Sequence, residues 1–390
     1  MTALSKRIAQ VRPSLTLSIT AKAKALKAQG IDVVSLSAGE PDFDTPDFIK
    51  DAAIDALRKG VTKYTPAEGT LELRKAIVAK LKRDQSLGYA PDEIVVSCGA
   101  KHSIFNLFQV LLNVADEVLI PAPYWLSYPE MVTLSGGKSV FLETTEKTEF
   151  KITPSQLEKA ITTRTKILVL NSPSNPTGAV YRKKELEALV PVLLKYPHVW
   201  ILSDEIYEKL IYDGESHVSI AELHPDIAKR TLLVNGHSKA YAMTGWRMGY
   251  SACPKEIADA VSNYQSHSTS NPTSFAQAGA VVALERGEAE VTKMRQVFEK
   301  RRNLFVSELR KIPMLKVFSP QGAFYVFVNI EATGLDSMKL TERLLEEARV
   351  AVVPGAVFGS DRHLRLSFAC SEEDLLESSR RINKWISELH

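Results

Sequence analysis

The sequence predicts an α/β protein with a large, doubly wound, mainly parallel sheet domain and a smaller α+β domain beside it. Between residues 93 and 235, short apolar runs alternate with helical patterns, as parallel strands joined by crossover helices do. After one long helical pattern at 288–311, the rhythm changes to closely spaced strands. At 390 residues the chain is too long for one small core, so two joined domains are expected.

The expected boundaries give an N-terminal arm and helix (1–35) that packs with the smaller domain, a large domain (36–287) and a small C-terminal domain (288–390). The first helix, 16–29, ends at Gly30, a residue typical of helix ends. A strand at 33–37 then leads into a turn-rich loop, 39–46. In the small domain we expect strands at 315–318, 323–329, 350–353 and 363–368 and helices at 337–348 and 371–389.

The large domain carries its polar residues where predicted strands end. After a helix at 47–59 and an amphipathic helix beyond Gly69, strands are expected at 93–97, 117–120, 166–170, 199–203 and 231–234, and helices at 101–112 and 182–195. Gly99, Asn175, Asp204 and the run before Lys239 all follow such strands. Ligands of open α/β sheets bind outside the carboxyl ends of the strands, so these residues predict a shared site.

Composition and charge exclude several classes of protein. A net charge of +3 without a block of Lys and Arg argues against nucleic-acid binding. No apolar run approaches eighteen residues and no signal peptide is recognisable, so we expect a cytoplasmic protein that is not bound to a membrane. Cys98, Cys253 and Cys370 are interpreted as small buried hydrophobic residues, and no metal site is expected.

Lys239 is the residue around which the candidate chemistry is organised. It lies where the apolar run Thr-Leu-Leu-Val (231–234) gives way to small and polar residues. An isolated lysine is usually a surface residue. A lysine at a strand end facing a cavity, however, loses proton affinity by desolvation and can form a Schiff base with a carbonyl compound.

Ser238-Lys239, followed eight residues after the lysine by Arg247 in Thr-Gly-Trp-Arg-Met-Gly, resembles the cofactor-attachment signature of the fold-type I pyridoxal-phosphate aminotransferases. The closest resemblance is to class I, and within it to the bacterial and plastid subgroup of aspartate aminotransferases, some members of which also transaminate prephenate. It extends over essentially the whole chain.

The resemblance implies roles around the ring of pyridoxal 5'-phosphate. Lys239 would hold the cofactor and then transfer protons, and Asp204 would pair with the ring nitrogen. Asn175 and Tyr207 would donate hydrogen bonds to the ring oxygen, and Trp125 would stack on the ring, although a core-filling role is its ordinary alternative.

Glu205 is the neighbouring rival to Asp204. The run Asp-Glu-Ile-Tyr (204–207) is similar to the family's Asp-x-x-Tyr, which favours the first acid.

The cofactor phosphate is expected at the start of the helix that follows Gly99, since helix N-termini bind anions. The implied phosphate ligands are the backbone N–H groups of Ala100 and Lys101, the Ser238 hydroxyl, the Arg247 guanidinium and Tyr64 from a neighbouring subunit. Tyr64 therefore implies a homodimer with shared active sites. Gly236 stands where many relatives have serine, so one hydroxyl contact to the phosphate is expected to be missing.

For the substrate, the resemblance assigns the α-carboxylate to Arg365 and places Gly39 in the pocket wall. Another subgroup uses an arginine in the region of 262–277, which has none here. Lys101 and Ser14 stand where the bacterial and plastid subgroup holds the second carboxylate of an acidic substrate, and Arg12 stands where a basic residue is linked to prephenate.

These residues together predict ping-pong transamination of L-aspartate with 2-oxoglutarate, giving oxaloacetate and L-glutamate, with prephenate as a further acceptor that would yield arogenate. An aromatic or broad-specificity aminotransferase and a pyridoxal-phosphate lyase on the same fold are the alternatives. A transcription regulator would need a DNA-binding module ahead of the Gly39 loop, and a nicotinamide dehydrogenase would need a Gly-x-Gly-x-x-Gly motif that the chain lacks. The ranking of aspartate, glutamate and aromatic donors stays open.

Overall fold

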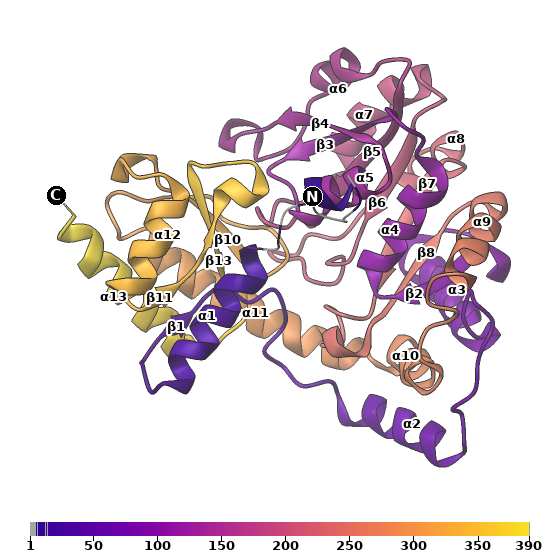
Figure 1. Cartoon of the computed structure of the whole chain (residues 1–390), viewed down its shortest axis with the longest axis horizontal. Coiled ribbons are helices and arrows are strands. Elements are labelled where there is room, and N and C mark those ends of the chain that lie inside the picture. The colour runs from indigo at the N-terminus through magenta and orange to yellow at the C-terminus, as the bar shows by residue number, and fades with distance from the viewer. Residues whose placement is uncertain (1–4, 6, 12, 14, 390) are drawn as a thin grey trace.

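The computed structural model describes residues 5, 7–11, 13 and 15–389, leaving aside the side chains of Thr16 and Leu17. Figure 1 shows two neighbouring parts. One is a large sheet with helices around it, formed by the middle of the chain. The other combines the orange and yellow C-terminal residues with the indigo helix α1 (Leu15–Ala28).

Among the described residues, the large sheet has seven strands in the order β2-β8-β7-β6-β5-β3-β4. Their bounds are β2 (Ile94–Cys98), β8 (Met248–Ala252), β7 (Thr231–Gly236), β6 (Trp200–Asp204), β5 (Thr165–Asn171), β3 (Glu117–Ala122) and β4 (Lys138–Glu143). All pairs from β7 to β4 are parallel. The expectation of a large, mainly parallel sheet is therefore confirmed.

Strand β8 is antiparallel to both β2 and β7, which makes β2 and β7 parallel to each other. The carboxyl ends of β2, β5, β6 and β7 consequently lie along one edge of the sheet. Neither β8 nor β4 is predicted from the sequence. The first is the short run Met-Gly-Tyr-Ser-Ala, and the second is an edge strand with only one buried residue, so neither shows a strong apolar pattern.

Both faces of this sheet are buried, as is usual for parallel sheets. Val95 belongs to one apolar cluster with Val118, while its neighbours Ile94 and Val96 belong to another with Leu233. The helices of this part are α2 (Asp47–Arg58), α3 (Leu71–Gln85), α4 (Ala100–Leu111), α5 (Ser127–Leu134), α6 (Pro154–Ala160), α7 (Lys183–Lys195), α8 (Pro225–Ala228), α9 (Lys255–Ser266) and α10 (Ser274–Arg286). No described helix is both long and apolar enough to cross a membrane.

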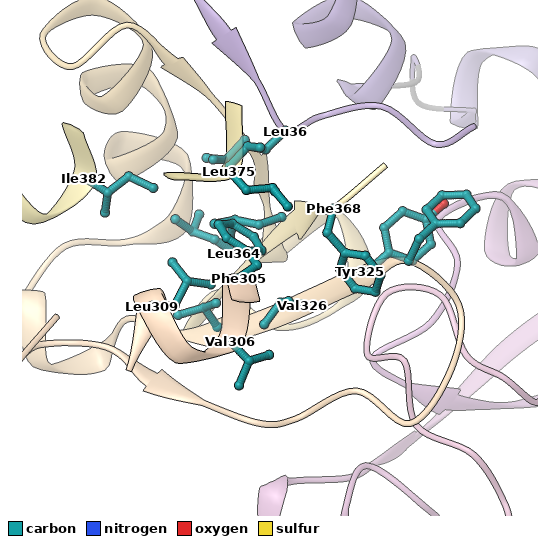
Figure 2. Close-up of a cluster of buried hydrophobic side chains, with 14 of the residues drawn as sticks. Leu36, Phe305, Val306, Leu309, Tyr325, Val326, Leu364, Phe368, Leu375 and Ile382 are labelled. Atoms are coloured by element: carbon teal, nitrogen blue, oxygen red, sulfur yellow. The ribbon is translucent and has the colours of Figure 1, made fainter. Parts of the chain in front are cut away.

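The C-terminal part contains an antiparallel four-stranded sheet within the described residues. In sheet order its strands are β12 (Val353–Pro354), β13 (His363–Ser367), β10 (Tyr325–Asn329) and β9 (Lys316–Val317), and its helices are α11 (Glu288–Leu309), α12 (Ser337–Glu346) and α13 (Glu372–Ser387). Figure 2 shows Phe305 of α11, Leu364 of β13 and Leu375 of α13 in its apolar core.

The N-terminal segment shares this core. Strand β1 (Val34–Ser35) pairs in parallel with β11 (Val350–Ala351), and Leu36 belongs to the same apolar cluster as Leu375 (Figure 2). The domain boundaries at residues 35/36 and 287/288 stay predictions.

Two predicted strands of the C-terminal part differ from the structure. The strand expected at 323–329 begins only at Tyr325, because Ala323 has a positive φ of 56° that is incompatible with an extended backbone. The strand expected at 350–353 is divided into β11, which pairs with β1, and β12, which pairs with β13. One apolar run thus serves two sheets.

Candidate active site

A cavity of about 860 Å³ lies at the carboxyl ends of the parallel strands. Residues from α1, the loop after β1, the start of α4 and the ends of β5, β6 and β7 form its wall. The predicted site residues that line it are Gly39, Ala100, Lys101, Trp125, Asn175, Asp204, Tyr207, Ser238, Lys239, Arg247 and Arg365. The fold therefore brings together residues that are spread over more than three hundred positions of sequence.

Three predicted site residues are not among them. Tyr64 lies outside the cavity wall with 89% of its surface exposed. Arg12 and Ser14 lie outside the described residues. Their predicted contributions stay predictions.

Lys239 follows β7 and is half-buried in the cavity. Its Nζ donates a hydrogen bond to the Gly39 carbonyl and lies 5.8 Å from the Tyr207 ring centre and 5.7 Å from that of Phe324. Burial lowers the pKa of Lys239 from 10.5 to about 8. More of this amine is consequently unprotonated near neutral pH than of an ordinary lysine, so it can act as a base.

Asp204 is the last residue of β6 and is almost fully buried. The Tyr128 hydroxyl donates to its Oδ2 at 2.5 Å, and the Ile206 N–H lies 3.3 Å from Oδ1. Burial raises the pKa of Asp204 from 3.8 to about 6, and the Tyr128 bond partly opposes this rise. Such a carboxylate gains most from a cationic partner at the cavity, such as a protonated ring nitrogen.

Replacing Asp204 by asparagine should change how stability depends on pH in the cofactor-free protein. Between pH 3.8 and about 6 the folded wild type holds a proton that the unfolded chain releases, so its stability falls as pH rises through this window. The difference in unfolding free energy between wild type and Asp204→Asn should therefore change by about 3 kcal/mol from acid to neutral pH. Denaturant titrations at several pH values measure it, and parallel profiles for the two proteins would contradict it.

Tyr128 is a site residue that the sequence analysis missed. Its position three residues after Trp125 was the available signal, because residues with this spacing lie on one side of a helical turn. The two rings meet edge to face with centres 5.2 Å apart.

Changing Tyr128 to phenylalanine should raise the pKa of Asp204 further and, above pH 6, cost about 1–3 kcal/mol of stability, because a buried carboxylate oxygen loses its donor. Tyr89→Phe is the matched control, since the buried Tyr89 hydroxyl has no hydrogen-bond partner in the described part of the chain. Chemical denaturation of both variants tests this. Equal losses in the two variants would contradict it.

Arg365 lies on β13 and is fully buried at the cavity wall. One Nη donates to Asn175 Oδ1 at 3.0 Å and the other to the Ser37 carbonyl at 3.1 Å, while its buried Nε has no partner among the described residues. The guanidinium carbon lies 4.4 Å from the Tyr325 ring centre. No carboxylate among the described residues neutralises this buried cation, so the arrangement suits an anionic ligand.

The start of α4 forms an anion cradle with Arg247. Gly99 has a φ of +87°, and a Cβ there would lie 2.4 Å from Arg247 Nη2. Arg247 itself donates to the carbonyls of Cys98 and Thr244 at 3.2 and 2.8 Å. The close approach of a guanidinium to the first N–H groups of a twelve-residue helix fits a phosphate group.

Gly236 is packed closely between strands. A Cβ there would lie 2.9 Å from the Gly249 Cα and from the Met248 carbonyl. A serine at this position would need the two strands to shift, which gives a local reason for glycine. The missing hydroxyl contact stays a prediction.

The remaining polar groups of the cavity are held by one another. The hydroxyls of Tyr207 and Tyr325 are 2.9 Å apart, and the Asn171 amide oxygen accepts the N–H of Asn175 at 2.9 Å. Lys101 Nζ lies 5.0 Å from the Trp125 ring centre. Burial lowers the pKa of Lys101, and the Arg247 charge adds to this effect.

Glu205 is occupied elsewhere. Its carboxylate accepts hydrogen bonds from Gln85, Ser203 and Ser219, and it lies 2.9 Å from the His217 Nε2. It is not part of the cavity wall, whereas Asp204 is. Of these two acids, only Asp204 therefore faces the cavity, and its role at the ring nitrogen stays a prediction.

Glu205, Glu208 and His217 lie close enough together to hold a metal ion. The Lys80 Nζ, however, is 2.5 Å from a Glu208 oxygen and already supplies a cation there. This cluster is explained without a metal.

Comparisons with known proteins agree over almost the whole chain. The family profile described as "Aminotransferase class I and II" matches residues 31–382. An aspartate aminotransferase of Geobacillus stearothermophilus is 52% identical over 98% of both chains. An aspartate/prephenate aminotransferase of Nitrosomonas europaea is 47% identical over 98% of this chain and 100% of that protein. The crystal structure of the aspartate aminotransferase from Rhizobium meliloti superposes with a TM-score of 0.96 at 43% identity, covering 100% of both chains.

Proposed function

This chain belongs to the class I and II aminotransferase family, and on that premise we propose that it transfers the amino group of L-aspartate to 2-oxoglutarate, giving oxaloacetate and L-glutamate. One observation carries the proposal: an amine of lowered pKa (Lys239), a buried carboxylate (Asp204) and a buried guanidinium without a carboxylate partner in the described part of the chain (Arg365) line a single cavity. The names of the similar proteins support aspartate as the amino donor.

Aminotransferases of this family use pyridoxal phosphate, which when bound supplies an electron sink for the substrate's α-carbon. In our proposal the α4 N-terminus, Ser238 and Arg247 hold its phosphate, and Asp204 pairs with its ring nitrogen. The cavity is large enough for a cofactor and a small substrate together.

The remaining ring contacts use Trp125, Asn175 and Tyr207. Trp125 offers a flat surface, while Asn175 and Tyr207 offer uncharged donors. Tyr325 keeps the Tyr207 hydroxyl in place through the 2.9 Å contact.

The substrate's α-carboxylate binds Arg365, whose planar guanidinium can donate two parallel hydrogen bonds. This contact orients the α-carbon toward Lys239. Lys239 Nζ then removes the proton from that carbon in one half-reaction and returns a proton to the α-carbon of the second substrate in the other. Since both substrates use the same groups, they bind one after the other.

Lys101 supports the preference for an acidic substrate. It lies on the cavity wall beside Trp125, where its ammonium can receive the second carboxylate of aspartate. Ser14 is proposed to assist it. Prephenate as a further acceptor is supported by the names of several relatives, with Arg12 as the proposed contact.

A homodimer completes the proposal. Tyr64 is exposed, and Ile54, Leu57, Val61 and Leu71, which are near it in the sequence, are exposed apolar residues. A second copy of the chain would cover these residues and bring Tyr64 to the phosphate of the neighbouring site. Light scattering tests the dimer, and a monomeric mass at micromolar concentration would contradict it.

The visible absorption spectrum tests the central proposal. With pyridoxal phosphate bound, adding L-aspartate should bleach the yellow form, and adding 2-oxoglutarate or prephenate should restore it. Assays for oxaloacetate and glutamate then identify the products. Release of ammonia with no dependence on an oxo acid would contradict transamination and favour a lyase.

A further inference from the structure

Helix α1 presents one face to the cavity. Thr20, Ala23, Lys24 and Lys27 all line it, at the spacing i, i+3, i+4 and i+7 that places residues on one side of a helix. Ala23 is buried, while Lys24 and Lys27 are exposed at the rim. Two cationic side chains thus stand at the entrance of the site.

Neither lysine has an acidic partner among the described residues. Lys22, on another face of the same helix, is 3.4 Å from Glu346 instead. The described cavity wall carries the cations Lys24, Lys27, Lys101, Lys239, Arg247 and Arg365 but only the acids Glu40 and Asp204. The α-carboxylate and the phosphate need only Arg365 and Arg247, so the rim carries a surplus of positive charge.

The rim is tied to the part of the site that binds the α-carboxylate. The hydroxyl of Thr20 is 3.0 Å from that of Ser37, and the Ser37 carbonyl accepts a hydrogen bond from Arg365. In Figure 1, α1 lies with the C-terminal part rather than with the large sheet. The helix that carries Lys24 and Lys27 is therefore linked to Arg365 through Thr20 and Ser37.

We propose that Lys24 and Lys27 form an outer anion subsite that receives the distal carboxylate of dicarboxylic substrates longer than aspartate. This inference rests on the proposed function, and it adds a rim contribution to the inner one of Lys101. Unpaired charges at a cleft entrance raise the local concentration of oppositely charged ligands and speed their association. The gain should fall as salt screens exposed charges.

Calorimetric titration of the protein saturated with pyridoxal phosphate tests the subsite with two unreactive acids, glutarate and butyrate. In the double variant Lys24→Gln/Lys27→Gln, the dissociation constant for glutarate should rise about tenfold at low salt, near the lower end of such electrostatic effects. That for butyrate should change less than about twofold, because butyrate has no second carboxylate. Lys22→Gln is the matched control on the same helix and should change neither.

An unchanged affinity for glutarate, or an equal loss for both acids, would overturn the subsite. The wild type is assayed in parallel for aspartate transamination. If the wild type transaminates aspartate but the double variant binds glutarate as tightly as the wild type does, only the subsite is refuted. If the wild type does not transaminate aspartate but its affinity for glutarate still depends on the two lysines, only the proposed function is refuted.

Discussion

Replacing Lys239 by alanine is expected to lower the turnover of L-aspartate by at least about 10⁴-fold, the upper end of what a positioned acid or base contributes. Its Nζ donates to the Gly39 carbonyl and lies 5.8 Å from the Tyr207 ring centre and 5.7 Å from that of Phe324, and burial lowers its pKa to about 8. Steady-state kinetics measure the loss. The protein should remain folded, because removing a desolvated cation relieves an unfavourable burial.

The Lys239→Arg variant distinguishes the loss of proton transfer from the loss of the positive charge. Arginine keeps the positive charge but does not release its proton in proteins, so this variant should be as inactive as Lys239→Ala. Unchanged thermal unfolding of both variants excludes a folding defect. Activity above about one hundredth of wild type in either variant would contradict the role of Lys239 in proton transfer.

Exchanging Arg365 for lysine is expected to lower kcat/KM for L-aspartate by about 10²–10³-fold, as loss of a buried, hydrogen-bonded charge contact does. Lysine keeps the charge but cannot donate two parallel bonds to a carboxylate. It would also leave Asn175 Oδ1 or the Ser37 carbonyl without a donor. Kinetics with several amino acids measure the effect.

Comparing aspartate with phenylalanine as substrates distinguishes the role of Arg365 from that of Lys101. Every amino acid carries an α-carboxylate, so Arg365→Lys should reduce activity toward aspartate and phenylalanine to a similar degree. Lys101→Gln should reduce activity toward aspartate alone, because only the acidic side chain reaches Lys101 in the proposal. If Arg365→Lys reduced activity toward aspartate alone, Arg365 would be assigned to the side-chain carboxylate and Lys101 to the α-carboxylate.

Local patterns were enough to predict most secondary-structure elements, because most strands and helices carry an apolar period of their own, which β4 and β8 do not. The same patterns placed Asp204 and Lys239 at strand ends, and the parallel order of β5, β6 and β7 brings those ends to one edge. Arg365 is different. It lies on an antiparallel strand of the other sheet, and only the resemblance pointed to it before the structure placed it on the cavity wall.

The contacts that set the electrostatics were decided by tertiary structure. Tyr128 and Asp204 are separated by 76 positions and Arg365 and Ser37 by 328, so no local pattern reports that their side chains touch. Local patterns also do not report which contacts the adjacent acids Asp204 and Glu205 make. Alternation along a strand sends neighbouring side chains to opposite faces, but only packing reveals which face holds the cavity and which holds His217.

The sequence by itself determined the fold class and the family resemblance, because these follow from periodicity and motif spacing. The reactive groups were predicted through that resemblance. Only the tertiary structure decided which groups share a cavity, how far burial shifts the pKa values of Asp204 and Lys239, and that one face of α1 brings Lys24 and Lys27 to its rim. Burial and proximity depend on long-range packing, and the sequence of one segment does not show which distant segments it will contact.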